Sequence, residues 1–213
     1  MRYPAKGLLF DNDGVLSDSI DSVDASWGKW ASLYAPDFEI SYKHHGIRAE
    51  ELVAKYVSAD LYDEALRKII EFEIAMTHLT RPMPGAAELI NTLPAGAWTV
   101  VTSAQPELAR ARLKQAGIPI PDELVTSSDV TQGKPDPQPY LVGAQKLGLH
   151  IKECAVFEDA PIGILSATRA GAGLVVGVGP AAIETDADLV VRDLKGISFD
   201  GTELTIDSES RLR

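Results

Sequence analysis

Two aspartates stand two residues apart directly after a short apolar run. The run is Leu8-Leu9-Phe10, and Asp11 and Asp13 follow it. Crowded carboxylates need a cation or a shared proton to offset their repulsion, and open α/β sheets bind ligands at the carboxyl ends of their strands. The pair therefore favours a Mg²⁺-dependent phosphoryl-transfer site in which Asp11 attacks as a carboxylate.

The backbone turn at these aspartates determines whether both side chains can reach the same site. Gly14 directly follows Asp13 and permits a turn at that point. An Asp-Gly pair alone more often marks only a turn. The prediction of chemistry therefore depends on the polar residues that accompany the pair.

Three further polar groups occur where apolar runs meet loops. Thr102-Ser103 precedes a helical pattern, so a hydroxyl and backbone N–H groups there can hold a phosphate. Lys134, in a turn-rich loop, can neutralise both a phosphate and the attacking carboxylate. Glu158-Asp159 ends another apolar run, and oxygen ligands from Asp11 and Asp159 suit Mg²⁺. Each group alone has an ordinary structural explanation. Together with the first aspartate pair they make four such groups, each where an apolar run or a helical pattern meets a loop, and this favours a single site.

Short apolar strands alternate with helical patterns along most of the chain. This alternation predicts an α/β protein with a doubly wound, Rossmann-like parallel sheet, because strands covered on both faces read as continuous apolar runs. Glycines at 117, 148 and 171 are expected to end three of the helices. The expected strands are Gly7 to Phe10, Trp98 to Thr102, Ala155 to Phe157, Leu174 to Val178 and Leu189 to Val191.

A long segment without a convincing strand interrupts this pattern early in the chain. Apolar residues at three- and four-residue spacing predict helices in it. We therefore expect a catalytic core formed by residues 1–16 and 82–213, and an inserted helical cap formed by residues 17–81. Residues after about 200 are polar and are expected to form a short edge element or a frayed tail.

The motifs resemble those of the haloacid dehalogenase-like superfamily over essentially the whole chain. They are Asp11-Asn12-Asp13-Gly14-Val15-Leu16, Thr102-Ser103, Lys134-Pro135 and Glu158-Asp159-Ala160-Pro161. The resemblance implies that Asp11 is the nucleophile and that Asp13 is the general acid and base. It also implies a Mg²⁺ ion on Asp11, Asp159 and the Asp13 carbonyl, with Glu158 as a ligand or neighbour. Thr102, Ser103 and Lys134 would hold the phosphoryl group.

The acid at position 13 and the segment His44-His45-Gly46-Ile47-Arg48 narrow the expected reaction. Haloacid dehalogenases lack an acid there, because a departing halide needs no proton. The segment resembles the cap loop of glycerol-3-phosphate and 2-deoxyglucose-6-phosphate phosphatases, which implies that Arg48 and His45 bind substrate. The expected activity is hydrolysis of a small sugar or polyol phosphate. A β-phosphoglucomutase-like mutase and a non-catalytic phosphometabolite-binding protein remain the alternatives.

Composition limits the partners and the compartment. The 213 residues carry a formal net charge of −11, which argues against a nucleic-acid-binding surface. No apolar stretch reaches the roughly 18 residues of a membrane span, and no signal-peptide core precedes Asp11. Cys154 is the single cysteine, so a cytoplasmic location is expected. The oligomeric state stays open, and a monomer is plausible.

Overall fold

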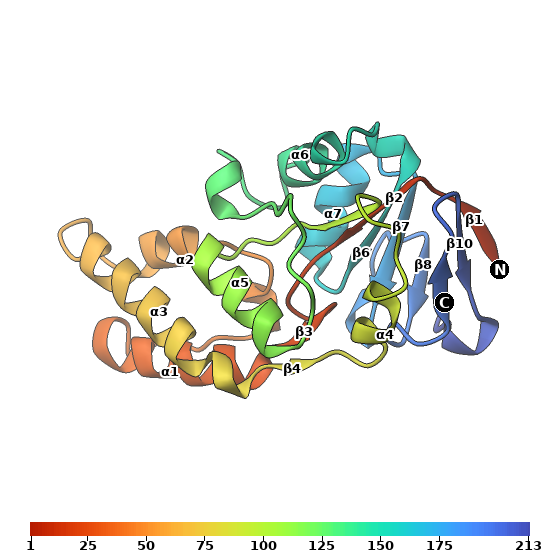
Figure 1. The fold of residues 1–213 in the computed structure, drawn as a ribbon. Coiled ribbons are helices and arrows are strands. Elements are labelled where there is room, and N and C mark those ends of the chain that lie inside the picture. The colour runs from red at the N-terminus through yellow and green to blue at the C-terminus, as the bar shows by residue number, and fades with distance from the viewer.

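A five-stranded parallel sheet forms the centre of the molecule (Figure 1). The computed structural model describes residues 1–213, apart from the side chain of Tyr42. Every neighbouring pair of strands in the sheet is parallel, as the uninterrupted apolar runs predicted. In spatial order the strands are β5 (Trp98–Val100), β2 (Gly7–Phe10), β6 (Cys154–Glu158), β7 (Leu174–Val178) and β8 (Leu189–Val191).

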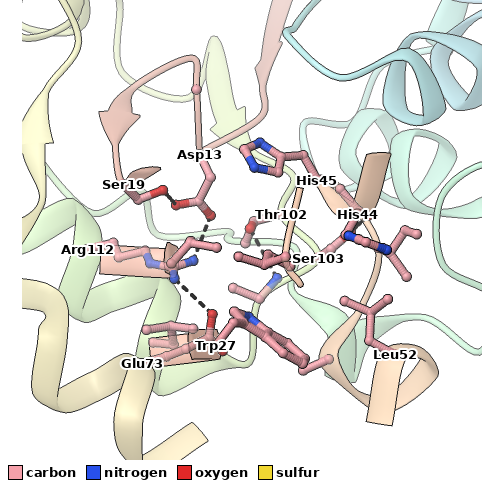
Figure 2. A pocket seen from close by; sticks show the side chains of 18 of the residues that line it. Asp13, Ser19, Trp27, His44, His45, Leu52, Glu73, Thr102, Ser103 and Arg112 are labelled. Atoms are coloured by element: carbon pink, nitrogen blue, oxygen red, sulfur yellow. Dashed lines mark hydrogen bonds and ion pairs between the residues drawn. The ribbon is translucent and has the colours of Figure 1, made fainter. Parts of the chain in front are cut away.

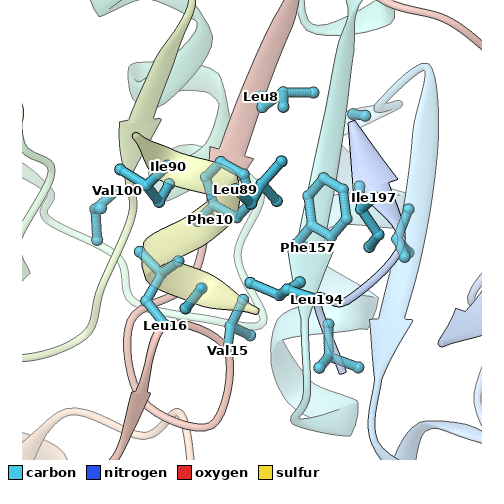
Figure 3. Packing of buried hydrophobic residues seen from close by; sticks show 14 of the residues in the cluster. Leu8, Phe10, Val15, Leu16, Leu89, Ile90, Val100, Phe157, Leu194 and Ile197 are labelled. Carbon is cyan, nitrogen blue, oxygen red and sulfur yellow. The ribbon is translucent and has the colours of Figure 1, made fainter. Parts of the chain in front are cut away.

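Helices cover both faces of this sheet, so the doubly wound prediction is confirmed. Side chains of α4 (Ala86–Ile90) and α5 (Pro106–Gln115) pack on the face that carries Leu8 and Phe10. Side chains of α6 (Gln138–Lys146) and α7 (Pro161–Ala170) pack on the face that carries Leu9. Figure 3 shows Phe10 beside Phe157 of the next strand, with ring centroids 4.8 Å apart. The glycines expected to end α5, α6 and α7 all have positive φ.

Three further helices pack together around a separate hydrophobic cluster. They are α1 (Ile20–Tyr34), α2 (Ala49–Tyr56) and α3 (Tyr62–Met76), and Figure 1 shows them at one end of the molecule, next to α5. The Trp30 indole N–H donates to the Ala65 carbonyl at 2.8 Å and so joins α1 to α3. This is the helical insertion that the sequence predicted. Its limits at residues 17 and 81 stay a prediction.

A short antiparallel pair lies where the chain enters and leaves these helices. Strand β3 (Ser17–Asp18) pairs with β4 (Arg81–Pro82). The two connections therefore run side by side, and we refer to α1, α2, α3 and the loops between them as the cap. Within the described residues, no helix combines the length and the apolar character needed to cross a membrane.

A second, three-stranded antiparallel sheet uses both ends of the chain, and it was only partly expected. Its order is β1 (Arg2–Pro4), β10 (Glu203–Ile206) and β9 (Ile197–Phe199). The C-terminal residues thus form an ordered sheet rather than a frayed tail, because Leu204 and Ile206 bury their side chains in the main core. The 3₁₀ helices are Tyr42–His44, Thr77–Leu79, Ser127–Asp129, Ile151–Glu153, Pro180–Ala182 and Ser208–Ser210.

Candidate active site

Asp11 and the pair Glu158-Asp159 leave the sheet at the same edge. In the parallel pairing of β2 with β6, Phe10 lies opposite Phe157. The Asp11 N–H donates to the Phe157 carbonyl at 2.9 Å. The residues that follow these two phenylalanines are therefore held next to one another by backbone hydrogen bonds.

Lys134 lies between two of these carboxylates. Its Nζ is 2.6 Å from Asp11 Oδ1 and 2.5 Å from Glu158 Oε1, and the side chain is fully buried. Glu158 also accepts hydrogen bonds from the Tyr140 hydroxyl at 3.0 Å and the Ala160 N–H at 2.9 Å. A buried charge is tolerated when it is paired and hydrogen-bonded, so this network fixes the lysine against Asp11.

The charges of this group are incompletely compensated. We call the side chains of Asp11, Lys134, Glu158 and Asp159 the site floor. Burial raises the pKa of Asp11 to about 7, although Lys134 opposes the shift. Burial and the Glu158 carboxylate also raise the pKa of Asp159 well above its usual value. Three carboxylates against one ammonium favour an additional cation.

The donor set of the floor fits a hard divalent cation. Asp11, Glu158 and Asp159 each offer a carboxylate oxygen, and these oxygens lie within 4.8 Å of one another. Oxygen ligands of this kind are those that Mg²⁺ takes in proteins. The contact of the Asp13 carbonyl with a metal, implied by the family resemblance, stays a prediction.

A tight turn follows Asp11 and includes Gly14. The Asn12 carbonyl accepts the N–H groups of Leu16 and Ser17 at 2.9 and 2.8 Å. Gly14 has φ +85°, and a Cβ at this position would collide with the Asp159 carboxylate. Gly14 is therefore required for its backbone conformation and for the close approach of Asp159, as the turn prediction anticipated in part.

Asp13 projects from this turn with both carboxylate oxygens engaged. The Ser19 hydroxyl donates to Oδ1 at 2.7 Å, and Arg112 Nη1 donates to Oδ2 at 3.0 Å. The side chain is 27% exposed. Asp13 is thus oriented by two donors while part of its surface stays accessible.

A cavity of about 120 Å³ separates the site floor from the cap. Asp11, Asp13, Asp159 and Thr102 line it from the core, whereas His45 belongs to its cap side. Figure 2 shows Asp13, Thr102 and His45 around it. A single water needs about 10–15 Å³ by this measure. The cavity therefore has room for several water molecules or a small ligand.

Thr102 and Ser103 follow β5 and lie at the cavity, as predicted. Thr102 is buried, and its Oγ1 accepts the Ala104 N–H at 3.1 Å. The Ser103 hydroxyl donates to the Gly46 carbonyl at 2.7 Å. This hydroxyl therefore fastens residues 44–48, which we call the cap loop, to the core.

The structure separates the two predicted substrate residues of the cap loop. His45 lines the cavity, and burial lowers its pKa. Arg48 does not line it: Nη2 lies 2.7 Å from Glu51 Oε1, and the guanidinium packs over Gly133. The expectation that Arg48 contacts substrate therefore gains no support from the geometry, because a helix neighbour three residues away already binds it.

Sequence reasoning missed a buried ion pair between the cap and the core. Arg112 of α5 donates from Nη2 to Glu73 Oε1 of α3 at 3.0 Å, and the two side chains are 4% and 8% exposed. Both residues line the cavity. A signal was present: Arg112 follows Leu108 and Glu73 follows Ile69 by four residues, so each charge falls on an apolar helix face.

This arrangement, a parallel sheet with an acidic edge beneath a helical cap, agrees with a match to a known family. A family model described as haloacid dehalogenase-like hydrolase matches residues 5–171. The chain belongs to this family, and the resemblance inferred from its motifs is confirmed.

Individual relatives carry phosphatase names. Hexitol phosphatase A of Escherichia coli (strain K12) is 39% identical over 203 residues, which cover 91% of this chain and 93% of that protein. Glycerol-1-phosphate phosphohydrolase 2 of Saccharomyces cerevisiae is 31% identical over 226 residues, with 97% and 90% covered. A solved structure of β-phosphoglucomutase from Clostridium difficile has a TM-score of 0.78 at 21% identity, with 92% and 94% covered. This last likeness concerns the fold alone.

Proposed function

We propose that this protein is a Mg²⁺-dependent phosphatase that hydrolyses a small sugar or polyol phosphate. The observation that carries the proposal is the placement of Asp11. Its carboxylate contacts buried Lys134 at 2.6 Å and lines a cavity that Asp13 also lines. The names of the hexitol and glycerol-1-phosphate relatives support the substrate class.

In the first half-reaction, Asp11 forms an acyl phosphate. A carboxylate oxygen of Asp11 attacks phosphorus, and the bond between phosphorus and the ester oxygen breaks. Asp13 gives its proton to that departing oxygen, so an alcohol leaves. Lys134, Thr102 and the Ser103 backbone hold the phosphoryl oxygens and offset their charge.

In the second half-reaction, water releases the phosphate. Asp13, now a carboxylate, takes a proton from a water molecule as its oxygen attacks phosphorus. The bond between phosphorus and the Asp11 oxygen breaks, and inorganic phosphate forms. Asp11 returns to its carboxylate form and Asp13 to its acid form, so the cycle closes.

Asp11 and Asp159 would hold Mg²⁺, with the Asp13 carbonyl and Glu158 as further ligands or neighbours. When bound, the ion supplies positive charge that reduces repulsion between the nucleophile and the phosphoryl oxygens. Burial is the largest cause of the raised pKa values of Asp11 and Asp159, and the neighbouring carboxylates add to it. A bound cation would favour the ionised form of both groups.

The cavity and the surface charge support a small-molecule partner rather than a polymer or a membrane. The cavity holds only about 120 Å³ beneath the cap. A net charge of −11 disfavours nucleic acid. We also propose a cytoplasmic location, in keeping with a single, buried and unpaired cysteine.

The test is phosphate release from a panel of sugar and polyol phosphates, with Mg²⁺ and with EDTA. We expect metal-dependent release concentrated on a few linear or small-ring compounds. Isomerisation of hexose phosphates without phosphate release would replace the proposal by a mutase. Tight binding with neither reaction would identify a binding protein.

A further inference from the structure

A buried set of polar contacts connects Asp13 to the cap. The Ser19 hydroxyl donates to one carboxylate oxygen of Asp13 and Arg112 to the other, at 2.7 and 3.0 Å. Arg112 in turn donates to Glu73 of α3 at 3.0 Å. Figure 2 shows these side chains in sequence along one side of the cavity.

Arg112 contacts more carboxyl groups than the neutralisation of its charge requires. Glu73 alone offsets the charge of Arg112, yet Arg112 also contacts Asp13 at the same distance of 3.0 Å. Burial acts to lower the pKa of Arg112, but Asp13 and Glu73 outweigh it and the pKa is raised. Arg112 therefore remains a cation, held between the carboxyl groups of Asp13 and Glu73.

The orientation of Asp13 matters for the proposed reaction. A general acid must place its proton within hydrogen-bond reach of the departing oxygen. Donors on both carboxylate oxygens set the plane of the carboxyl group. One of these donors, Arg112, comes from the core helix α5 and is also held by Glu73 of the cap helix α3.

We propose that Arg112 is the positioning residue of Asp13, and that Glu73 fixes Arg112 so that the cap helix α3 sets the orientation of the acid and base. This inference rests on the proposed phosphatase function. Arg112 acts through Asp13, in the step in which the alcohol receives a proton and in the step in which water gives one up.

The dependence of kcat/KM on the leaving group distinguishes positioning of Asp13 from a merely structural role of Arg112. The parameter kcat/KM covers the steps up to alcohol release. An alkyl leaving oxygen requires the proton from Asp13, whereas a p-nitrophenyl leaving oxygen departs as a stable anion. Loss of positioning should therefore lower kcat/KM for alkyl phosphates and spare p-nitrophenyl phosphate.

The experiment compares n-propyl phosphate, glycerol-1-phosphate and p-nitrophenyl phosphate. For Arg112→Met we expect kcat/KM to fall about 100-fold for both alkyl esters and less than about 5-fold for the aryl ester. Glu73→Gln should also lower kcat/KM more for the alkyl esters than for the aryl ester, with a loss of about 10-fold for the alkyl esters. Arg110→Met is the matched control, because Arg110 is exposed on the same helix and its removal should leave all three values unchanged.

A paired variant keeps the test valid if Arg112→Met fails to fold. Glu73→Met with Arg112→Met removes both buried charges, and such replacements are often neutral or stabilising. The folded double variant should show the same selective loss. In an Asp13→Asn background, Arg112→Met should add little, because residues acting as a unit are non-additive.

Three results would overturn the inference. An equal loss on all three esters would make Arg112 structural. A loss confined to glycerol-1-phosphate would make it a binder of substrate hydroxyls. If the losses of kcat/KM from Arg112→Met and Asp13→Asn were additive, the two residues would act independently. Wild-type protein inactive on every ester would instead refute the proposed function.

Discussion

The site floor and the cap loop hold their charged side chains in different ways. Asp11 and Glu158 sit at the ends of two neighbouring strands, and the Lys134 ammonium between them is fully buried. In the cap loop, Arg48 pairs with Glu51 three residues away, and the Glu51 side chain is 41% exposed. The floor is therefore built by contacts distant in sequence, whereas the charge of Arg48 in the cap loop is paired locally.

This difference shows where chemistry and selectivity are located. Backbone pairing fixes the floor, so its geometry does not depend on the substrate's alcohol. The cap side contains His45 and Glu73, and Glu73 pairs with Arg112 of the core helix α5 where the two helices pack together. We infer that changes to the floor affect every substrate and that changes to the cap discriminate between substrates.

The largest expected effect comes from Asp11→Asn. An amide cannot attack phosphorus, so turnover should fall by at least about 10³-fold on every phosphate ester. Steady-state phosphate release checks it, with circular dichroism as the control for folding. Activity retained on any single ester would show that the floor does not act uniformly.

Removal of the floor cation should cost more stability than removal of a surface cation. Lys134→Met leaves the Asp11 and Glu158 carboxylates buried without their partner, at a cost of about 3–5 kcal/mol. That corresponds to a fall in Tm of roughly 10 °C. Lys146→Met is the control: Lys146 pairs with Asp129 at 2.8 Å near the surface, and its loss should cost under about 1 kcal/mol. Equal losses in thermal melts would contradict the contrast.

The floor should also make stability depend on pH in the absence of metal. The pKa of Asp11 is raised to about 7 in the folded protein, and the unfolded chain loses this proton near 4. The stabilisation from protonated Asp11 is thus complete below about pH 4 and is lost as the pH rises through about 7. Mg²⁺ should raise Tm by several degrees more at pH 8 than at pH 5.5, because it binds the ionised carboxylates.

Asp11→Asn supplies one control for this pH effect, since it should flatten the dependence measured in EDTA. Asp186→Asn supplies the other, because Asp186 is exposed and its replacement should leave the wild-type profile in place. A Mg²⁺ shift in Tm independent of pH would place the cation elsewhere.

The smallest effects should come from the cap loop and should separate His45 from Arg48. His45→Ala removes a side chain that lines the cavity, so kcat/KM on the preferred substrate should fall about 10-fold, the value of one hydrogen bond. Arg48→Ala should change kcat/KM by less than about 3-fold, because Arg48 binds Glu51. A 10-fold loss for Arg48→Ala would restore the substrate role that its motif suggested.

The sequence was most informative where backbone geometry determines position. Asp11 and Glu158-Asp159 each end an apolar run, and parallel pairing must bring such ends together. Arg112 and Glu73 were missed because their meeting depends on how α3 packs against α5. The assignment of Arg48 overlooked Glu51, a competing partner visible at helix spacing.

The small sheet was only partly expected, for a different physical reason. Strands β9 and β10 flank Asp200-Gly201, a dipeptide typical of hairpin turns. Their apolar residues alternate with polar ones, which makes a three- or four-residue strand hard to distinguish from a loop. The pairing of β10 with β1 joins residues about 200 positions apart, and no local pattern predicts it.

The bond from the Ser103 hydroxyl to the Gly46 carbonyl bears on how readily the cap loop separates from the core. A neutral hydrogen bond contributes about 0.5–1.5 kcal/mol net, which biases an open–closed equilibrium by roughly 2- to 10-fold. A contact of this strength therefore does not by itself hold the cap loop against the core. Hydrolysis of a phosphate ester releases an alcohol and then phosphate, and one weak contact opposes either departure only slightly.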